Sequence, residues 1–94
     1  MAVVVVNEIP RGDQSFYDEV SARVLPEGGL PEGCQVHIAG PSGGGWRVIT
    51  VWDSEEQFQQ FRNEKLLPAI QELGRGEMVA PNIDAQPVHR LITP

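Results

Sequence analysis

The sequence predicts an α+β fold in which a four-stranded antiparallel sheet carries both helices on one face. Three observations support this prediction. Residues 3–6 form a β-branched run typical of a strand, three glycines at positions 43–45 separate two further apolar segments, and a polar, helix-like stretch begins at Ser54. With an early helix and a late strand the order is β-α-β-β-α-β, which is the ferredoxin-like arrangement.

The N-terminal third is predicted to form the first strand and the first helix. Residues 3–6 are four valines in succession, as in a strand that is buried on both faces, and Pro10 breaks the strand soon after. Asp13 is a suitable N-cap for a helix that runs to about Leu25 and stops before a proline. Apolar residues recur four apart along one face of this helix: Phe16, Val20 and Val24.

The glycine run is predicted to be the turn of a hairpin between strands at residues 34–39 and 46–52. A phosphate-binding glycine loop would follow a strand, open a helix and carry a Lys-Ser/Thr pair. Here the glycines open a strand, and Trp46 and Arg47 stand where that pair would be. The sequence therefore indicates a turn and no nucleotide site.

The second helix is predicted to begin at Ser54, because residues 54–57 read S-E-E-Q and fit a capping box with acidic residues in the first turn. The apolar positions change phase between Phe61 and Leu66. We expect a kink, or two short helices that meet, near Pro68. Glycines at 74 and 76 are predicted to end the helix.

After a polar loop across positions 81 and 82, residues 84–92 are predicted to form the last strand. The fold places the first and third strands in the centre of the sheet and the second and last strands at its edges. Pro87 agrees with this order, since a proline cannot donate to neighbours on both sides and is tolerated at an edge.

Composition restricts the classes of partner. The 94 residues predict one domain spanning 1–94, and the net charge of −6 disfavours nucleic acid and anionic membranes as partners. No apolar run is long enough to span a membrane or to form a signal peptide. Cys34 is the only cysteine, which favours a reducing, cytoplasmic setting. We expect a soluble chain.

The predicted sheet has apolar residues on both faces, although the helices can cover only one. The third strand sends Trp46, Val48, Thr50 and Trp52 to one face and Ile49 and Val51 to the other. A large apolar surface would remain exposed in a monomer. We therefore predict a homodimer that packs sheet against sheet across a two-fold axis.

The segment VWDSEEQF at residues 51–58 takes the third strand directly into a capped helix. With the element order and the chain length, this transition resembles the dimeric α+β barrel superfamily, particularly its antibiotic-biosynthesis-monooxygenase-like branch. In that branch the corresponding helix borders a pocket between the sheet and the helices.

The resemblance implies a small-molecule enzyme without a cofactor, of the monooxygenase-like type, acting on an aromatic or polyketide-like substrate. Two alternatives stay open: an aldol-type cyclase or isomerase on the same scaffold, and a non-catalytic ligand-binding or accessory dimer. An open pocket favours an enzyme, whereas a pocket filled by Phe16, Phe58 and Leu66 favours the non-catalytic protein.

Histidine is the residue type whose ordinary pKa suits proton transfer near neutrality, and the chain has two. His89 is our predicted base, because the last strand should flank the strand that carries Asn7, the predicted oxyanion donor. Asn7 falls where heme-degrading members of the branch carry a pocket asparagine, although the Trp and His that they also use on the second helix are missing here. An asparagine that closes its own turn is the structural alternative.

For His37 we favour an interface role. Cys34 and His37 are three apart on a strand and should point to opposite faces, so no metal site is predicted. The expected substrate-binding residues are aromatic or apolar side chains of the first helix, the third strand and the second helix: Tyr17, Trp46, Trp52, Phe58, Phe61 and Leu66.

Overall fold

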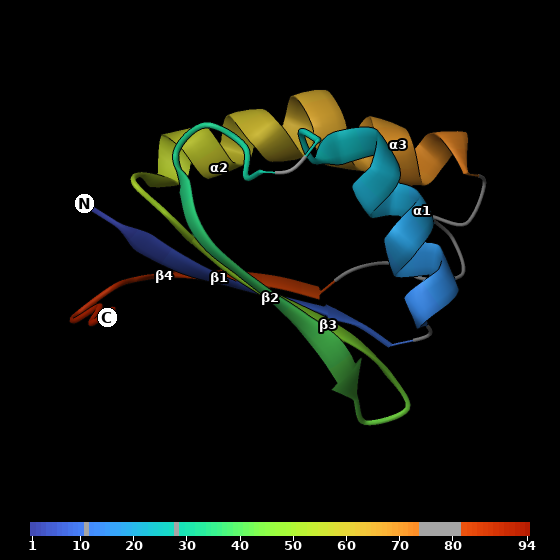
Figure 1. The fold of residues 1–94 in the computed structure, drawn as a ribbon, viewed down its shortest axis with the longest axis horizontal. Coiled ribbons are helices and arrows are strands. Elements are labelled where there is room, and N and C mark those ends of the chain that lie inside the picture. The colour runs from blue at the N-terminus through green and yellow to red at the C-terminus, as the bar shows by residue number, and fades with distance from the viewer. Residues whose placement is uncertain (11, 28, 74–81) are drawn as a thin grey trace.

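The computed structural model describes residues 1–10, 12–27, 29–73 and 82–94, and has the predicted α+β architecture (Figure 1). The described helices lie on one side of a single four-stranded sheet. In chain order the elements are β1 (Val3–Ile9), α1 (Gln14–Val24), β2 (Cys34–Ser42), β3 (Gly45–Trp52), α2 (Glu55–Phe61), η1 (Arg62–Leu66), α3 (Leu67–Glu72) and β4 (Asn82–Pro87).

The strand order is β2-β3-β1-β4 and every neighbouring pair is antiparallel. The predicted sheet order is therefore confirmed, with β1 and β3 in the centre. Pro87 is the last residue of the edge strand β4, the position where a missing N–H does least damage.

A two-residue turn joins β2 to β3. Gly43 and Gly44 both have positive φ angles, 53° and 85°, as a type I′ hairpin turn requires. Ser42 and Gly45 are the closing pair, so the register of the two strands follows from the turn: Ala39 lies opposite Val48 and His37 opposite Thr50.

Both predicted helix N-caps are confirmed. The Asp13 carboxylate accepts a hydrogen bond from the backbone N–H of Phe16 at 2.8 Å, and the Ser54 hydroxyl accepts one from the N–H of Gln57 at 3.2 Å. Each bond satisfies a donor that has no partner inside the helix, which stabilises a helix by about 1 kcal/mol.

The second helix is continuous from Glu55 to Glu72 and contains a π-helical segment, η1, between its two α-helical parts. This segment accounts for the change of apolar phase, because a π-turn spans one more residue than an α-turn. Two short α-helices, α2 and α3, thus meet across the π-helical segment close to Pro68, which lies in the first turn of α3. The predicted glycine stop at 74 and 76 lies outside the described residues. No helix in the described part of the chain could cross a membrane.

Two buried clusters form the core under the helices. One joins Ile9 of β1 to Phe16, Val20 and Ile70 of α1 and α3, and the other joins Val3, Val5 and Trp52 of the sheet to Phe58 of α2. Residues of odd number on β1 and of even number on β3 point towards the helices, as strand alternation requires. The space between the two clusters is where a pocket can form.

The boundaries of all four strands differ from the prediction: β2 continues to Ser42 instead of residue 39, and β3 begins at Gly45 instead of residue 46. β1 continues to Ile9, because all seven of its residues pair with β3. β4 spans Asn82–Pro87 instead of residues 84–92, since the ladder with β1 ends at Pro87. His89 consequently lies beyond the strand, and its side chain is exposed.

The second face of the sheet is not covered by any of the described helices (Figure 1). The predicted burial of β1 on both faces is therefore wrong for a single chain: Val3 and Val5 are buried, whereas Val4 and Val6 are only partly buried. Burial on one side follows from the placement of these helices on the other.

Candidate functional site

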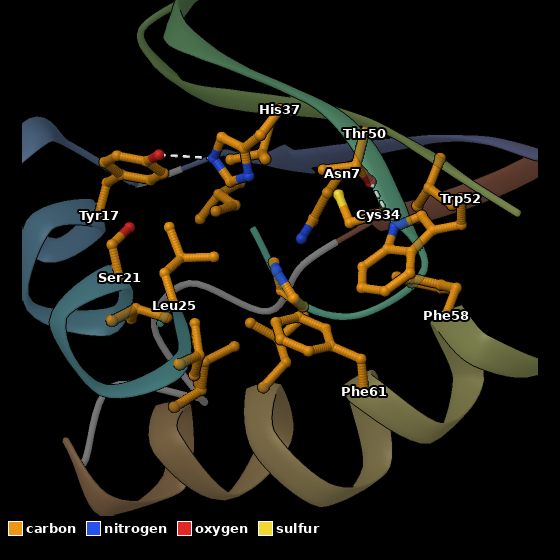
Figure 2. Close-up of a pocket in the computed structure, with 18 of the residues that line it drawn as sticks. Asn7, Tyr17, Ser21, Leu25, Cys34, His37, Thr50, Trp52, Phe58 and Phe61 are labelled. Carbon is orange, nitrogen blue, oxygen red and sulfur yellow. Dashed lines mark hydrogen bonds between the residues drawn. The ribbon is translucent and has the colours of Figure 1, made fainter. Parts of the chain in front are cut away.

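A cavity of about 70 Å³ lies between the sheet and the helices, bordered by residues of both core clusters. Its walls are mainly aliphatic and aromatic. The lining consists of Val5, Asn7, Ile9, Phe16, Tyr17, Val20, Ser21, Val24, Leu25, Pro31, Cys34, His37, Val48, Thr50, Trp52, Phe58, Phe61, Leu66 and Ile70. Figure 2 shows Asn7, His37 and Thr50 on the side of the sheet, with Tyr17 and Ser21 on the side of α1.

Strand register brings three polar residues together on the cavity face. His37 on β2 lies directly opposite Thr50 on β3, which lies opposite Val5 on β1. Asn7 is two residues further along β1, so it is a diagonal neighbour of Thr50 at about 7–8 Å between backbones. The arrangement therefore places an imidazole, a hydroxyl and an amide on one apolar wall.

Tyr17 of α1 completes this group from the opposite side. Its hydroxyl oxygen is 2.6 Å from Nε2 of His37, and the two rings are tilted at 46° (Figure 2). Burial lowers the pKa of His37 below its ordinary value of 6.5, because the charged imidazolium loses hydration. At neutral pH His37 is therefore a neutral group that can accept a proton.

The two ring nitrogens of His37 have different surroundings. When Nε2–H donates to the Tyr17 oxygen, the lone pair is on Nδ1, for which no protein partner is seen among the described residues. In Figure 2 the second ring nitrogen lies on the side of the ring away from Tyr17 and towards Asn7. This tautomer presents a base to the cavity.

Asn7 carries a buried polar atom that none of the described residues satisfies. Its Oδ1 has no hydrogen-bond partner in that part of the chain, although the side chain lies in the middle of β1 and lines the cavity. An unpaired buried carbonyl of this kind costs about 1–3 kcal/mol. The alternative in which Asn7 closes its own turn is therefore wrong, and the amide is available to a ligand.

Thr50 is held by a hydrogen bond to a neighbour on the same strand. The Trp52 Nε1–H donates to the Thr50 hydroxyl oxygen at 2.9 Å, and both residues are buried. Because that oxygen accepts from the indole, its own hydrogen can be directed elsewhere. The Trp52 ring also packs against Phe58 and Phe61, with centroids 5.8 and 5.1 Å away, which fixes the aromatic end of the cavity.

Cys34 and His37 point into the same cavity, so the prediction that they face opposite sides is wrong. The register between β2 and β3 shifts between Cys34 and Val36, and the extra residue of this bulge turns Cys34 to the helix side. Burial raises the pKa of the Cys34 thiol, which also donates to the Val36 carbonyl at 3.5 Å. The described residues contain no cluster of three His, Cys, Asp or Glu side chains suited to a metal.

The structure brings six of the eight predicted site residues to the cavity: Asn7, Tyr17, Trp52, Phe58, Phe61 and Leu66. Trp46 shares the sheet face of Trp52 but packs outside the lining, 5.6 Å from Tyr17 between ring centroids, and its Nε1 is unpaired within the described ranges. His89 is exposed beyond the end of β4 and does not line the cavity with Asn7.

The sequence analysis did not place His37 in the cavity, although the hairpin carried the signal for it. With the turn placed at Gly43 and Gly44, antiparallel pairing puts His37 opposite Thr50. Thr50 belongs to the face of β3 that also carries Trp52. A histidine on that face points towards the helices.

Comparison with known proteins is informative at the level of structure alone. No protein-family model matches the sequence, and no curated protein does either. A solved variant of SnoaB, a cofactor-independent oxygenase from Streptomyces nogalater, has the same fold with a TM-score of 0.63 and 14% identity, over 97% of this chain and 95% of that chain.

Two further solved structures have the same fold as this chain. An inferred antibiotic biosynthesis monooxygenase from Deinococcus radiodurans gives a TM-score of 0.60 at 13% identity, over 99% of this chain and 97% of that one. An EthD-like protein from Ralstonia eutropha gives 0.53 at 18% identity, over 96% of each chain. This chain therefore has the same fold as these three solved proteins.

Proposed function

We propose that this protein is a cofactor-independent oxygenase that removes a proton from an aromatic or polyketide-like carbon acid and lets the resulting carbanion react with dioxygen. The observation that carries the proposal is the hydrogen-bonded pair of His37 and Tyr17 in an apolar cavity that Asn7 also lines, with its Oδ1 unpaired among the described residues. The oxygenase SnoaB has the same fold, which agrees with this reaction class.

The first step is proton transfer to His37. The substrate bears an acidic C–H next to a carbonyl, and Nδ1 of the neutral imidazole accepts that proton. The Tyr17 oxygen accepts the Nε2–H of the imidazolium that forms, and so stabilises it. A depressed pKa keeps the imidazole unprotonated and ready before each turnover.

The negative charge that develops on the substrate oxygen needs a donor. The Asn7 amide N–H and the Thr50 hydroxyl border the same cavity and can donate to this oxyanion, while Trp52 holds Thr50 in place. Such bonds are strong in this setting, because the surrounding side chains exclude water.

The second step needs only dioxygen as the oxidant. The carbanion transfers one electron to O₂, and the two radicals combine to a C–O bond, giving a peroxide that takes up the proton from the imidazolium. His37 then accepts the second proton on the same carbon, the O–O bond breaks as the carbonyl forms, and the released hydroxide takes this proton back from the imidazolium and leaves as water. A methylene group and O₂ thus become a carbonyl group and water, with four electrons passing from carbon to oxygen.

The cavity holds only the reacting part of such a substrate. A volume of about 70 Å³ is far below the roughly 300–1,000 Å³ of a drug-sized ligand site. Phe16, Phe58 and Leu66 line the cavity without filling it, so an aryl ring enters by displacing side chains of the wall. The rest of the molecule must lie outside.

We also propose that the active form is a homodimer, in which the uncovered face of the sheet packs against a second copy. The support for this proposal is a row of aliphatic side chains on that face, which runs from Val6 through Ile49 to Ile38. The last of these, Ile38, is 56% exposed.

The test uses anthrone, an aryl ketone with an acidic methylene group, and measures oxygen uptake with an electrode. Wild-type protein should accelerate uptake, and His37→Gln should lower the rate by about two to four orders of magnitude, the usual effect of losing a general base. His89→Gln is the matched control and should change the rate less than about twofold.

Other outcomes separate the alternatives. Deuterium exchange at the methylene carbon without oxygen uptake would replace the oxygenase by an aldol-type cyclase or isomerase that uses the same base. Equal rates for wild type and His37→Gln would remove the catalytic role of His37, and no reaction of either kind would favour a ligand-binding protein.

A further inference from the structure

A second hollow, of about 620 Å³, lies on the outer side of the cavity and is more open to solvent than the cavity. Its residues come from the end of α1, the segment after that helix, α2 and η1. They are Arg23, Val24, Leu25, Pro26, Pro31, Glu32, Gln57, Gln60, Phe61, Glu64 and Lys65. We call it the outer hollow.

The outer hollow and the cavity share one wall. Val24, Leu25, Pro31 and Phe61 line both. These four side chains are apolar and come from three separate parts of the chain, so no side-chain hydrogen bond ties them to one another. These side chains separate the outer hollow from the cavity that Tyr17 and His37 line, so a molecule that occupies both spaces must displace them.

We propose that the outer hollow binds an uncharged, hydroxylated tail of an elongated substrate whose aryl end occupies the cavity. The inference rests on the proposed function for the role of the cavity. It adds a second binding site and the chemical class that this site accepts.

The volumes of the cavity and of the outer hollow support placing the aryl end of the ligand in the first and its tail in the second. The cavity has room for about two water molecules, at about 30 Å³ each, so the aryl end enters it only by displacing side chains of the wall. The outer hollow is nearly nine times larger, as 620 Å³ divided by 70 Å³ gives. Most of any bound molecule therefore lies in the outer hollow, against polar side chains.

The charges around the outer hollow exclude a strongly anionic tail. Two cations, Arg23 and Lys65, are matched by two carboxylates, Glu32 and Glu64. Arg23 is already engaged, since its Nη1 donates to the Glu19 carbonyl at 3.3 Å and its Nε lies 3.6 Å from a carboxylate oxygen of Glu72. The remaining lysine beside two carboxylates gives no net attraction for a phosphate or carboxylate.

The amides favour hydroxyl groups instead. Gln60 is exposed on α2, and Gln57 stands one turn earlier on the same helix with its Oε1 accepting from the Ser54 hydroxyl at 3.2 Å. Each amide provides donors as well as an acceptor, and a hydroxyl group can serve both. A sugar or polyol is the tail that uses this set most fully.

The experiment measures, by calorimetry, the affinity of three compounds that share one aryl group: 2-naphthol, 2-naphthyl β-D-glucopyranoside and 2-naphthyl phosphate. The glucoside should bind about three- to tenfold more tightly than 2-naphthol, the effect of one or two net hydrogen bonds. The phosphate should bind no more tightly than 2-naphthol.

Gln60→Ala should remove the advantage of the glucoside and leave 2-naphthol binding unchanged. Gln71→Ala is the control, because Gln71 is exposed on α3 and lines neither space. Equal affinities of glucoside and 2-naphthol, an advantage that survives Gln60→Ala, or tighter binding of the phosphate would each overturn the inference.

Ser21→Leu separates this inference from the proposed function. Ser21 lines the cavity but not the outer hollow, so the larger side chain should fill the cavity and weaken all three compounds at least tenfold. If it weakens 2-naphthol while the glucoside gains nothing from its tail, only the outer hollow is wrong. If 2-naphthol binding does not depend on Ser21, or none of the compounds binds, the cavity as aryl site fails, and the tail inference with it.

Discussion

Each face of the sheet carries one group of side chains that its surroundings would not suggest, although the covered face is otherwise apolar. The face covered by helices holds the polar group of Asn7, His37 and Thr50. The uncovered face holds a two-by-three array of aliphatic residues, with an ion pair at the end of the array. The six residues are Val4, Val6, Val36, Ile38, Ile49 and Val51.

The two charged side chains at the end of this array form an ion pair on the uncovered face. Glu8 and Arg47 are opposite each other on β1 and β3, and their side chains pair at 2.5 Å while remaining partly exposed. The mid-strand arginine therefore makes a salt bridge on the face away from the cavity. In the polar group under the helices His37 and Thr50 have hydrogen-bond partners, whereas the Asn7 oxygen has none within the described residues.

This contrast separates two requirements. Apolar side chains in water need a partner surface, because each buried Å² contributes about 25 cal/mol to association. Polar atoms out of water need a ligand, because an unpaired buried acceptor costs about 1–3 kcal/mol. The uncovered face is thus suited to assembly and the covered face to chemistry.

The largest expected effect is on assembly. Ile38→Asp places a charge at a residue that is 56% exposed in the single chain, so the folded monomer should tolerate it. In a dimer the same charge would be buried without a partner, which costs about 3–5 kcal/mol and weakens association at least a hundredfold. Sedimentation equilibrium at micromolar concentration measures this change.

Gln71→Asp supplies the control for that experiment, because it adds the same charge at an exposed position of α3. It should leave the dimer intact. A wild-type protein that sediments as a monomer, or an Ile38→Asp variant that dimerises normally, would contradict assembly through this face.

A smaller effect is expected on the covered face from Asn7→Leu, which replaces the unsatisfied amide by an apolar side chain of similar size. We expect the free energy of unfolding to rise by about 1 kcal/mol, since the desolvation cost disappears. Oxygen uptake with anthrone should fall about tenfold or more through loss of the oxyanion donor. Urea denaturation and the oxygen electrode give the two values.

This variant is informative because its stability is expected to rise while its rate of oxygen uptake falls. Reduced stability together with unchanged oxygen uptake would show that Asn7 is a structural residue. Val6→Leu is the matched change on the uncovered face, and it should leave the rate of oxygen uptake unaltered.

The smallest expected effect is a pH dependence of stability. The pKa of His37 is lowered from 6.5 by burial, so below pH 6.5 the unfolded chain binds a proton that the native protein lacks. The contribution of the neutral imidazole to stability is therefore complete above pH 6.5 and declines as the pH falls towards the lowered pKa. Because the side chain is partly exposed, the loss in Tm should be under about 4 °C.

Thermal unfolding of wild type and His37→Gln at pH 7 and pH 5 tests this prediction. The wild type should lose more stability than the variant over this interval. An equal loss in both proteins would mean that His37 titrates alike in the folded and unfolded chains.

Much of this architecture could be predicted because short-range signals specify it. The capping residues Asp13 and Ser54 fix the helix starts, and the two-residue glycine turn fixes the hairpin. The aromatic side of the cavity followed from alternation along β3. Each of these depends on neighbours close in sequence.

The polar group of the site depends on pairing between distant strands, and there the sequence was less informative. His89 was predicted to share a pocket with Asn7, but the ladder of β4 ends at Pro87 and leaves His89 exposed. The bulge at Cys34 has no sequence signal, so its side-chain direction could not be derived. Phe61 and Leu66 were correctly predicted to line the pocket, whereas the π-helical segment between α2 and α3 was not predicted.

The π-turn in the long helix has a consequence for how this site can change. Phe61 and Leu66 are five residues apart, the span of one π-turn, and both reach the cavity. The half before the turn supplies the aromatic wall, and the half after it anchors the helix through Ile70 to α1. Phe58 and Phe61 lie before the inserted residue, and Ile70 lies after it. Substitutions at Phe58 and Phe61 should therefore change the shape of the cavity while the packing of Ile70 against α1 stays the same.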